Sequence, residues 1–162
     1  MGKFVLLDRD GVINQERGKH TFLPSDFKWV DGFWEGMQQL AQQGFQFVVI
    51  TNQSGIAKGL YQKKDVLTLN NLIFEKAASL GIKIEEIFYC PHHPDFSKCL
   101  CRKPGDLLFE KAIAKFNIQT EISWMIGDKE RDIIPAKKHG IKGILIEANT
   151  NFVKNIQPIL HG

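Results

Sequence analysis

Short apolar segments alternate with amphipathic segments along most of the chain. Apolar runs rich in β-branched residues are typical of strands that are buried on both faces of a sheet. They occupy residues 3–7, 45–51, 86–90, 123–128 and 142–148. Apolar positions spaced three or four residues apart predict helices. These occupy residues 32–43, 63–80, 106–116 and 131–140.

Strands that alternate with helices predict parallel pairing through right-handed crossovers. The expected fold is therefore α/β: a doubly wound, Rossmann-like open parallel sheet of about five strands with helices on both faces. Residues 14–31 lack a clean period and are expected to form a long loop. Residues 149–162 give no clear pattern beyond the option of a short helix. With 162 residues, we expect one domain over 1–162 without a large cap domain.

Composition narrows the classes of function. The chain is 43% hydrophobic and 24% charged, and 21 basic against 18 acidic residues leave a net charge of +3. This balance, without a Lys/Arg cluster, argues against nucleic acid as a partner. No apolar run is long enough to cross a membrane, and no signal peptide precedes the first strand. We expect a cytoplasmic protein with a small-molecule substrate and no membrane partner. No dimer face is evident, so a monomer is expected.

Polar side chains follow four of the predicted strands at the point where each strand ends. They are Asp8 and Asp10, Thr51 and Asn52, Cys90 and His92, and Asp128 and Asp132. One aspartate in such a place would be a turn or helix-cap residue. Several loops that bring acids and a hydroxyl to the carboxyl edge of a parallel sheet indicate a site instead.

The residue types at this edge suit phosphoryl transfer. The carboxylates of Asp8, Asp10 and Asp128 are hard oxygen ligands, which Mg²⁺ prefers. An ionised aspartate can act as a nucleophile, and a second one can transfer protons. Thr51 and Lys103 can bind the oxygens of a phosphoryl group. The sequence therefore predicts Mg²⁺-assisted phosphoryl transfer through an aspartyl-phosphate.

All three cysteines lie close together in the chain, beside two histidines. Cys90 and His92 form one pair, and Cys99 and Cys101 form another. A Cys₃His set is typical of a closed, structural Zn²⁺ site that rigidifies a loop without taking part in catalysis. His93 is the competing ligand. The alternative is three buried cysteines with a surface histidine.

Four motifs, in this order and spacing, resemble those of the haloacid dehalogenase superfamily of phosphohydrolases. They are DRDG at 8–11, TNQSG at 51–55, RKP at 102–104 and GDKERD at 127–132. The resemblance extends over roughly residues 4–148. The connection CPHHPDFSKCLCRKP is similar to that of the histidinol-phosphatase and heptose-bisphosphate phosphatase group.

This resemblance implies a role for each matching residue. Asp8 would be the nucleophile and a Mg²⁺ ligand. Asp10 would be the general acid/base and would offer its backbone carbonyl to Mg²⁺, with Asp128 as a further ligand. Thr51 and Lys103 would hold the phosphoryl group.

Other positions take supporting roles from the same resemblance. His92, rather than His93, would complete the zinc site. The residues implied in substrate binding are Asn52, Ser54 and Arg102. Arg102 suits a distal phosphate because of its bidentate fork, and a helix N-cap is the alternative for Ser54. Asp132 is expected to be a supporting or helix-capping residue.

Several neighbouring positions receive no chemical role. Lys129 either pairs with the acids of the site or is solvated. Arg9 is given no task between the two aspartates, and Gly11 is expected to let the chain turn. His20 and His139 are expected at the surface.

The resemblance implies a Mg²⁺-dependent phosphatase acting on a small phosphorylated metabolite. TNQSGIAKG is closer to the heptose branch, which favours a heptose 1,7-bisphosphate of envelope precursor synthesis. Val12 departs from the usual superfamily Thr but is tolerated in this group; the loop NQERGKHTFLP lacks the Tyr-Val of the heptose enzymes, and RKPGDLL is one residue shorter than the RKPxPGML type. These differences lie in or near the expected substrate walls. Histidinol phosphate is therefore an alternative substrate, and a non-catalytic phosphosugar-binding module is an alternative of another class.

Overall fold

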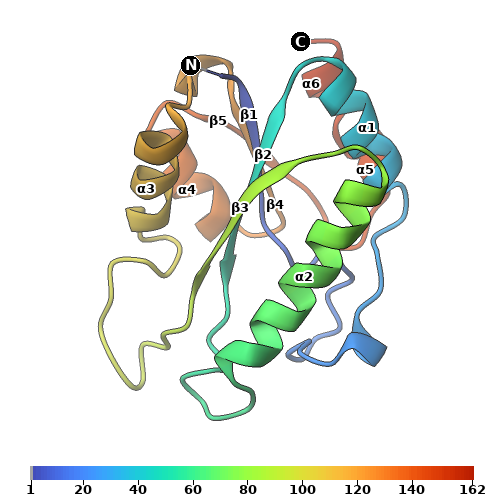
Figure 1. The fold of residues 1–162 in the computed structure, drawn as a ribbon. Coiled ribbons are helices and arrows are strands. Elements are labelled where there is room, and N and C mark those ends of the chain that lie inside the picture. Colours follow the sequence, from blue (N-terminus) through green and yellow to red (C-terminus); the bar gives the residue numbers. More distant parts are fainter. Residues whose placement is uncertain (1) are drawn as a thin grey trace.

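A five-stranded parallel sheet forms the centre of the protein in the computed structural model, which describes residues 2–162 (Figure 1). The strands are β1 (Phe4–Leu7), β2 (Gln46–Asn52), β3 (Ile84–Cys90), β4 (Trp124–Gly127) and β5 (Lys142–Leu145). Their order in the sheet is β3-β2-β1-β4-β5, and each neighbouring pair is parallel. The predicted doubly wound fold is confirmed.

Helices cover both faces of this sheet (Figure 1). One face packs against α1 (Phe33–Gln42), α2 (Lys63–Ser79), α5 (Phe152–Asn155) and α6 (Gln157–Leu160). The other face packs against α3 (Leu107–Phe116) and α4 (Glu130–Lys138). Successive side chains of a strand point to opposite faces. Val5 and Leu7 of β1 accordingly join the first core, and Phe4 and Leu6 join the second.

The strand order reverses beside β1, and this reversal positions the site. The chain runs outward from β1 through β2 to β3, then returns to place β4 on the other side of β1. In such sheets ligands bind outside the carboxyl ends of the strands at the point of reversal. Leu7 at the end of β1 is level with Val49 of β2 and Ile126 of β4. The loops after these three strands therefore emerge at one edge.

Some element boundaries differ from those expected. Strand β3 begins at Ile84 rather than at residue 86, and β5 ends at Leu145 rather than at 148. The 14–31 loop contains a 3-10 turn (Pro24–Asp26), and a second 3-10 turn (Thr120–Ile122) precedes β4. None of the helices within residues 2–162 has the length and apolar character needed to cross a membrane.

The C-terminal segment forms the two short helices α5 and α6. Each has four residues, which is too short to display a helical period in the sequence. Phe152 and Ile156 are fully buried against the first core. Gly36 of α1 makes room for this packing, because a Cβ there would meet Phe152 and would lie 3.1 Å from Ile156 Cδ1.

Gly36→Ala should therefore destabilise the protein although alanine favours helices. The gain in helix propensity is about 0.5–1 kcal/mol, whereas overpacking against the Phe152 ring costs about 1–3 kcal/mol. We expect a net loss of about 1–2 kcal/mol in the free energy of unfolding, measured by urea denaturation. Gln38→Ala, on the exposed side of the same helix, is the matched control and should change it by less than about 0.5 kcal/mol. A Gly36→Ala protein as stable as the parent would contradict this account of the packing.

Candidate active site

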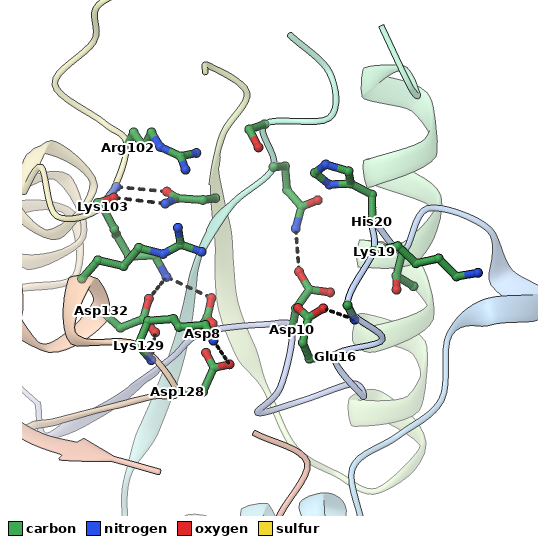
Figure 2. A pocket seen from close by; sticks show the side chains of 16 residues that line it. Asp8, Asp10, Glu16, Lys19, His20, Arg102, Lys103, Asp128, Lys129 and Asp132 are labelled. Carbon is green, nitrogen blue, oxygen red and sulfur yellow. Dashed lines mark hydrogen bonds and ion pairs between the residues drawn. The ribbon is translucent and has the colours of Figure 1, made fainter. Parts of the chain in front are cut away.

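A pocket of about 470 Å³ opens at the carboxyl edge of the sheet (Figure 2). It contains residues of all four predicted motifs. Those residues are Asp8, Asp10, Asn52, Gln53, Ser54, Arg102, Lys103, Asp128, Lys129, Arg131 and Asp132. The predicted convergence of the strand-end loops is therefore observed.

The ammonium group of Lys103 lies at the base of this pocket and has three partners. It donates to Asp8 Oδ1 at 2.9 Å and to the Ile50 carbonyl at 2.6 Å, and it lies 2.7 Å from Asp132 Oδ1. Only 1% of Lys103 is exposed. Burial alone would lower the pKa of Lys103, but Asp8 and Asp132 outweigh it and raise the pKa. Lys103 is therefore a buried, permanently charged group.

Three carboxylates surround this single ammonium. One oxygen atom from each of Asp8, Asp128 and Asp132 lies within 4.8 Å of the others. Burial raises the pKa of Asp8 well above its ordinary value; Lys103 opposes the rise and the neighbouring acids add to it. Burial also raises the pKa of Asp128. The cluster has three carboxyl groups beside one ammonium, and its oxygen donors suit a small divalent cation.

Both carboxylate oxygens of Asp132 have partners. Oδ1 pairs with Lys103, and Oδ2 accepts a 3.1 Å hydrogen bond from the backbone N–H of Lys129 at the start of α4. Asp132 therefore caps the helix, as expected, and it also forms an ion pair with Lys103 that the sequence did not predict. The Nζ of Lys129 lies 3.9 Å from Asp128 Oδ2, at the outer limit of an ion pair, on a side chain that is 55% exposed.

Gly11 allows the first motif to pass close to the fourth. Its φ of +90° is a backbone conformation that favours glycine, and a Cβ there would lie 2.7 Å from Asp128 Oδ2. Its N–H donates to the carbonyl of Asn14 at 2.7 Å, which closes the turn. The turn expected from the sequence is confirmed, and close approach to Asp128 is a second reason for glycine.

Arg9 takes part in the site, so the expectation that it has no task there is wrong. Only 1% of it is exposed, and Nη2 donates to Asp10 Oδ1 at 3.0 Å and to the Thr21 carbonyl at 3.0 Å. The 14–31 loop folds over the strand end and encloses the guanidinium, which strand periodicity does not reveal. Asn14 Nδ2 also donates to Asp10 Oδ1, at 3.0 Å. Burial tends to raise the pKa of Asp10, but Arg9, Asn14 and Gln53 outweigh it and lower the pKa.

Gln53 and Tyr61 are two site residues that the sequence reasoning missed. Gln53 Nε2 donates to Asp10 Oδ2 at 3.2 Å and to Thr51 Oγ1 at 2.9 Å, and the Tyr61 hydroxyl donates to Gln53 Oε1 at 2.8 Å. A signal existed for Gln53, because side chains two apart at a strand end point to the same side. The sequence held no comparable signal for Tyr61.

The three residues expected to bind substrate all line the pocket. The amide of Asn52 pairs with the backbone of Lys103, accepting from its N–H at 3.0 Å and donating to its carbonyl at 3.2 Å. Ser54 does not cap a helix, because the N-cap of α2 is Gln62. The Nη1 of Arg102 is buried and has no hydrogen-bond partner within residues 2–162.

The cysteine cluster forms in the connection between β3 and α3. Cys90, His92, Cys99 and Cys101 each place one ligand atom within 4.8 Å of the others, so the set could hold a metal ion. His92 Nδ1 lies 3.4 Å from Cys90 Sγ and 3.2 Å from Cys101 Sγ. His93 is outside the cluster, where its Nδ1 accepts a 3.1 Å hydrogen bond from the Asp95 N–H.

The two histidines expected at the surface are both engaged. His20 lines the pocket, and its ring meets that of Tyr61 edge-on with centroids 5.8 Å apart. His139 Nε2 lies 2.9 Å from Asp106 Oδ2, at the side of the molecule where α3 and α4 meet. Both side chains are only partly buried, so the expectation of a surface position is not contradicted, although each ring has a partner.

Comparisons with known proteins agree with this geometry. Residues 100–156 match the HAD-hydrolase-like family model. The D-glycero-beta-D-manno-heptose-1,7-bisphosphate 7-phosphatase of Pasteurella multocida is 37% identical over 98% of this chain and 85% of its own length. The D-glycero-alpha-D-manno-heptose-1,7-bisphosphate 7-phosphatase of Photorhabdus laumondii is also 37% identical, over 86% of this chain and 79% of its own.

A solved structure extends the likeness to three dimensions. The D,D-heptose 1,7-bisphosphate phosphatase of B. bronchiseptica, complexed with magnesium and phosphate, superposes with a TM-score of 0.83 at 29% identity, over 94% of this chain and 83% of its own. The sequence identity extends over nearly the whole chain, and the strand-end motifs meet in one pocket. The chain therefore belongs to the HAD-like hydrolases, in the family of the D-glycero-D-manno-heptose-1,7-bisphosphate 7-phosphatases.

Proposed function

We propose that this protein hydrolyses the 7-phosphate of a D-glycero-D-manno-heptose 1,7-bisphosphate through an aspartyl-phosphate on Asp8. The observation that carries the proposal is the setting of Asp8, which lies between Lys103 and Asp128 and faces the same pocket as Asp10 (Figure 2). The names of the relatives support the choice of substrate.

In the proposed reaction the two aspartates divide the work. An oxygen of Asp8 attacks phosphorus, and the bond to the sugar oxygen breaks. The negative charge of the bound phosphoryl group opposes the lowering of the Asp10 pKa by Arg9, Asn14 and Gln53 and favours the protonated form of Asp10, which gives its proton to that departing oxygen. Asp10 then takes a proton from the water that attacks the aspartyl-phosphate, which frees inorganic phosphate and restores Asp8. The Lys103 ammonium and the Thr51 hydroxyl hold the phosphoryl oxygens through both steps.

The carboxylate cluster fits a bound Mg²⁺. Asp8 and Asp128 are buried and close together, and Asp132 already uses both of its oxygens. This geometry supports Asp8 and Asp128 as protein ligands, and the resemblance of the first motif to the family adds the backbone carbonyl of Asp10. When bound, Mg²⁺ would supply positive charge that balances these acids and the phosphoryl oxygens.

Substrate recognition falls to the outer part of the pocket. Arg102 offers an unpartnered, buried N–H there, which suits the distal phosphate of a bisphosphate. Ser54 offers a hydroxyl for the sugar. Asn52 would contribute chiefly by fixing the backbone of Lys103, because its amide is already paired there.

The cysteine cluster would hold Zn²⁺ as a structural ion. Its four ligands leave no open position for catalysis. Cys101 precedes Lys103 by two residues, so the zinc loop would fix the segment that carries Arg102 and Lys103 into the pocket.

A substrate panel tests the proposed function. Release of inorganic phosphate is measured with both anomers of D-glycero-D-manno-heptose 1,7-bisphosphate and with histidinol phosphate, in the presence of Mg²⁺ or of EDTA. We expect a heptose bisphosphate to give the highest kcat/KM and EDTA to abolish turnover. A preference for histidinol phosphate would contradict the proposed substrate. If folded, zinc-loaded protein released phosphate from none of these compounds, the proposal that the protein is an enzyme would be refuted.

Asp8→Asn tests the nucleophile. The variant keeps the shape of the side chain but removes the attacking oxygen, so turnover should fall by about a thousandfold or more. The fold should persist, because the asparagine carbonyl oxygen can still accept the hydrogen bond from Lys103 and Asp132 remains as its counter-ion. Circular dichroism checks the fold, and phosphate release checks the chemistry. A variant that retains a tenth of the parental activity, or more, would refute the assignment.

Zinc should be present at about one ion per chain, as expected for a four-ligand site. Cys99→Ser should lose the metal and lower both thermal stability and activity, because the loop that carries Lys103 loosens. His93→Ala is the matched control and should keep its zinc, since His93 lies outside the cluster. Elemental analysis gives the metal content of each variant. A metal-free parent protein with full stability would contradict the zinc assignment.

A further inference from the structure

Gln53 is a buried polar residue of the pocket to which the reaction above gives no task. Only 3% of it is exposed, and its amide lies between Asp10 and Thr51. These are the residues proposed to transfer protons and to hold the phosphoryl group. The position of Gln53 raises the question of what its amide does for them.

The nitrogen and the oxygen of the Gln53 side-chain amide both have hydrogen-bond partners in the site. One amide group carries two N–H donors and one carbonyl acceptor. Nε2 donates to Asp10 Oδ2 at 3.2 Å and to Thr51 Oγ1 at 2.9 Å, while Oε1 accepts from the Tyr61 hydroxyl at 2.8 Å. If the amide group were flipped, the carbonyl oxygen of Gln53 would face the carboxylate of Asp10, and neither could donate a hydrogen bond. Only the observed orientation therefore satisfies the amide of Gln53.

Tyr61 is itself held in place. Its ring stacks on Phe22 with centroids 5.1 Å apart and an angle of 19° between the planes. Gly55 also lies against the ring, because any Cβ there would collide with it. The phenol therefore has one available position, and its hydroxyl fixes the far end of Gln53.

The two oxygens of Asp10 have different surroundings. Oδ1 receives hydrogen bonds from Arg9 and from Asn14, both at 3.0 Å. Oδ2 receives one, from Gln53 at 3.2 Å. Oδ2 is therefore the oxygen with capacity left to exchange a proton with substrate, and Gln53 is the group that sets its direction.

We propose that Gln53 is a positioning residue that aims Oδ2 of Asp10 at the leaving oxygen of the substrate, with Tyr61 fixing Gln53. The same amide also bonds to Thr51 and so keeps Thr51 at a constant distance from Asp10. The proton donor therefore keeps a fixed position relative to the phosphoryl group that Thr51 holds. This inference rests on the proposed function, because it requires Asp10 to protonate the leaving group.

The test compares two substrates that differ in their need for that proton. One is the alkyl phosphate that the parent protein turns over fastest in the panel above. The other is p-nitrophenyl phosphate, whose phenolate leaves without protonation. Because kcat/KM reports the steps up to departure of the leaving group, a fault in proton delivery lowers it for the alkyl phosphate only.

Gln53→Leu removes the amide at similar volume. We expect kcat/KM for the alkyl phosphate to fall roughly 10- to 100-fold, part of the 10²–10⁴ typical of general acid catalysis, with kcat falling and KM changing little. For p-nitrophenyl phosphate the loss should be at most about threefold, which allows for the looser Thr51 hydroxyl. Gln43→Leu is the matched control, since Gln43 is exposed and its side chain bonds to the Leu160 carbonyl, away from the pocket; it should leave both substrates unchanged.

Tyr61→Phe gives a second measurement that keeps the ring packing. It should show the same selective pattern at a smaller size, about 3- to 10-fold on the alkyl phosphate. Equal losses on both substrates, or no loss on either, would overturn the proposal for folded, zinc-loaded variants. A parent protein inactive on every phosphate would instead overturn the proposed function, so the two failures are distinguishable.

Discussion

The buried ammonium of Lys103 is the contact on which the rest of the site depends. Its three partners come from the ends of β1 and β2 and from the first turn of α4. Removing one partner from a buried ion pair typically costs about 3–5 kcal/mol, because a buried charge is left uncompensated. Here one such group neutralises repulsion among carboxylates that would otherwise drive the strand ends apart. The lysine is thus as much a part of the fold as of the pocket.

Two neighbouring features deliver Lys103 to that position. The cysteine cluster constrains the chain just before Lys103, and the side-chain amide of Asn52 hydrogen-bonds to both the N–H and the carbonyl of Lys103. The connection between β3 and α3 has little apolar packing, and Phe96 and Leu100 on it are exposed. Polar contacts and metal ligands therefore do here what a hydrophobic core does elsewhere. The likeness to the heptose-bisphosphate phosphatases includes this connection.

The sequence was sufficient for those parts of the site that follow directly from strand geometry. Asp8, Asn52 and Asp128 line one pocket because parallel strands in register end at one edge, and apolar periodicity indicates where each of these strands ends. Arg9, Gln53 and Tyr61 were missed because their contacts depend on how the 14–31 and 53–62 loops fold over that edge. Loop packing of this kind has no period. The helices α5 and α6 were not predicted for a related reason: four residues make barely one turn and therefore show no helical period in the sequence.

The position of β1 in the sheet also affects when the protein becomes competent during synthesis. The first strand made is the central one, and it stays incomplete until β4 pairs with it. The Phe4 N–H, for example, donates to Ser123 Oγ, which is 119 residues away. Pairings so distant in the chain form slowly, because a long loop must close first. Asp128 follows β4, so the carboxylate cluster of the site cannot form before this distant pairing is made.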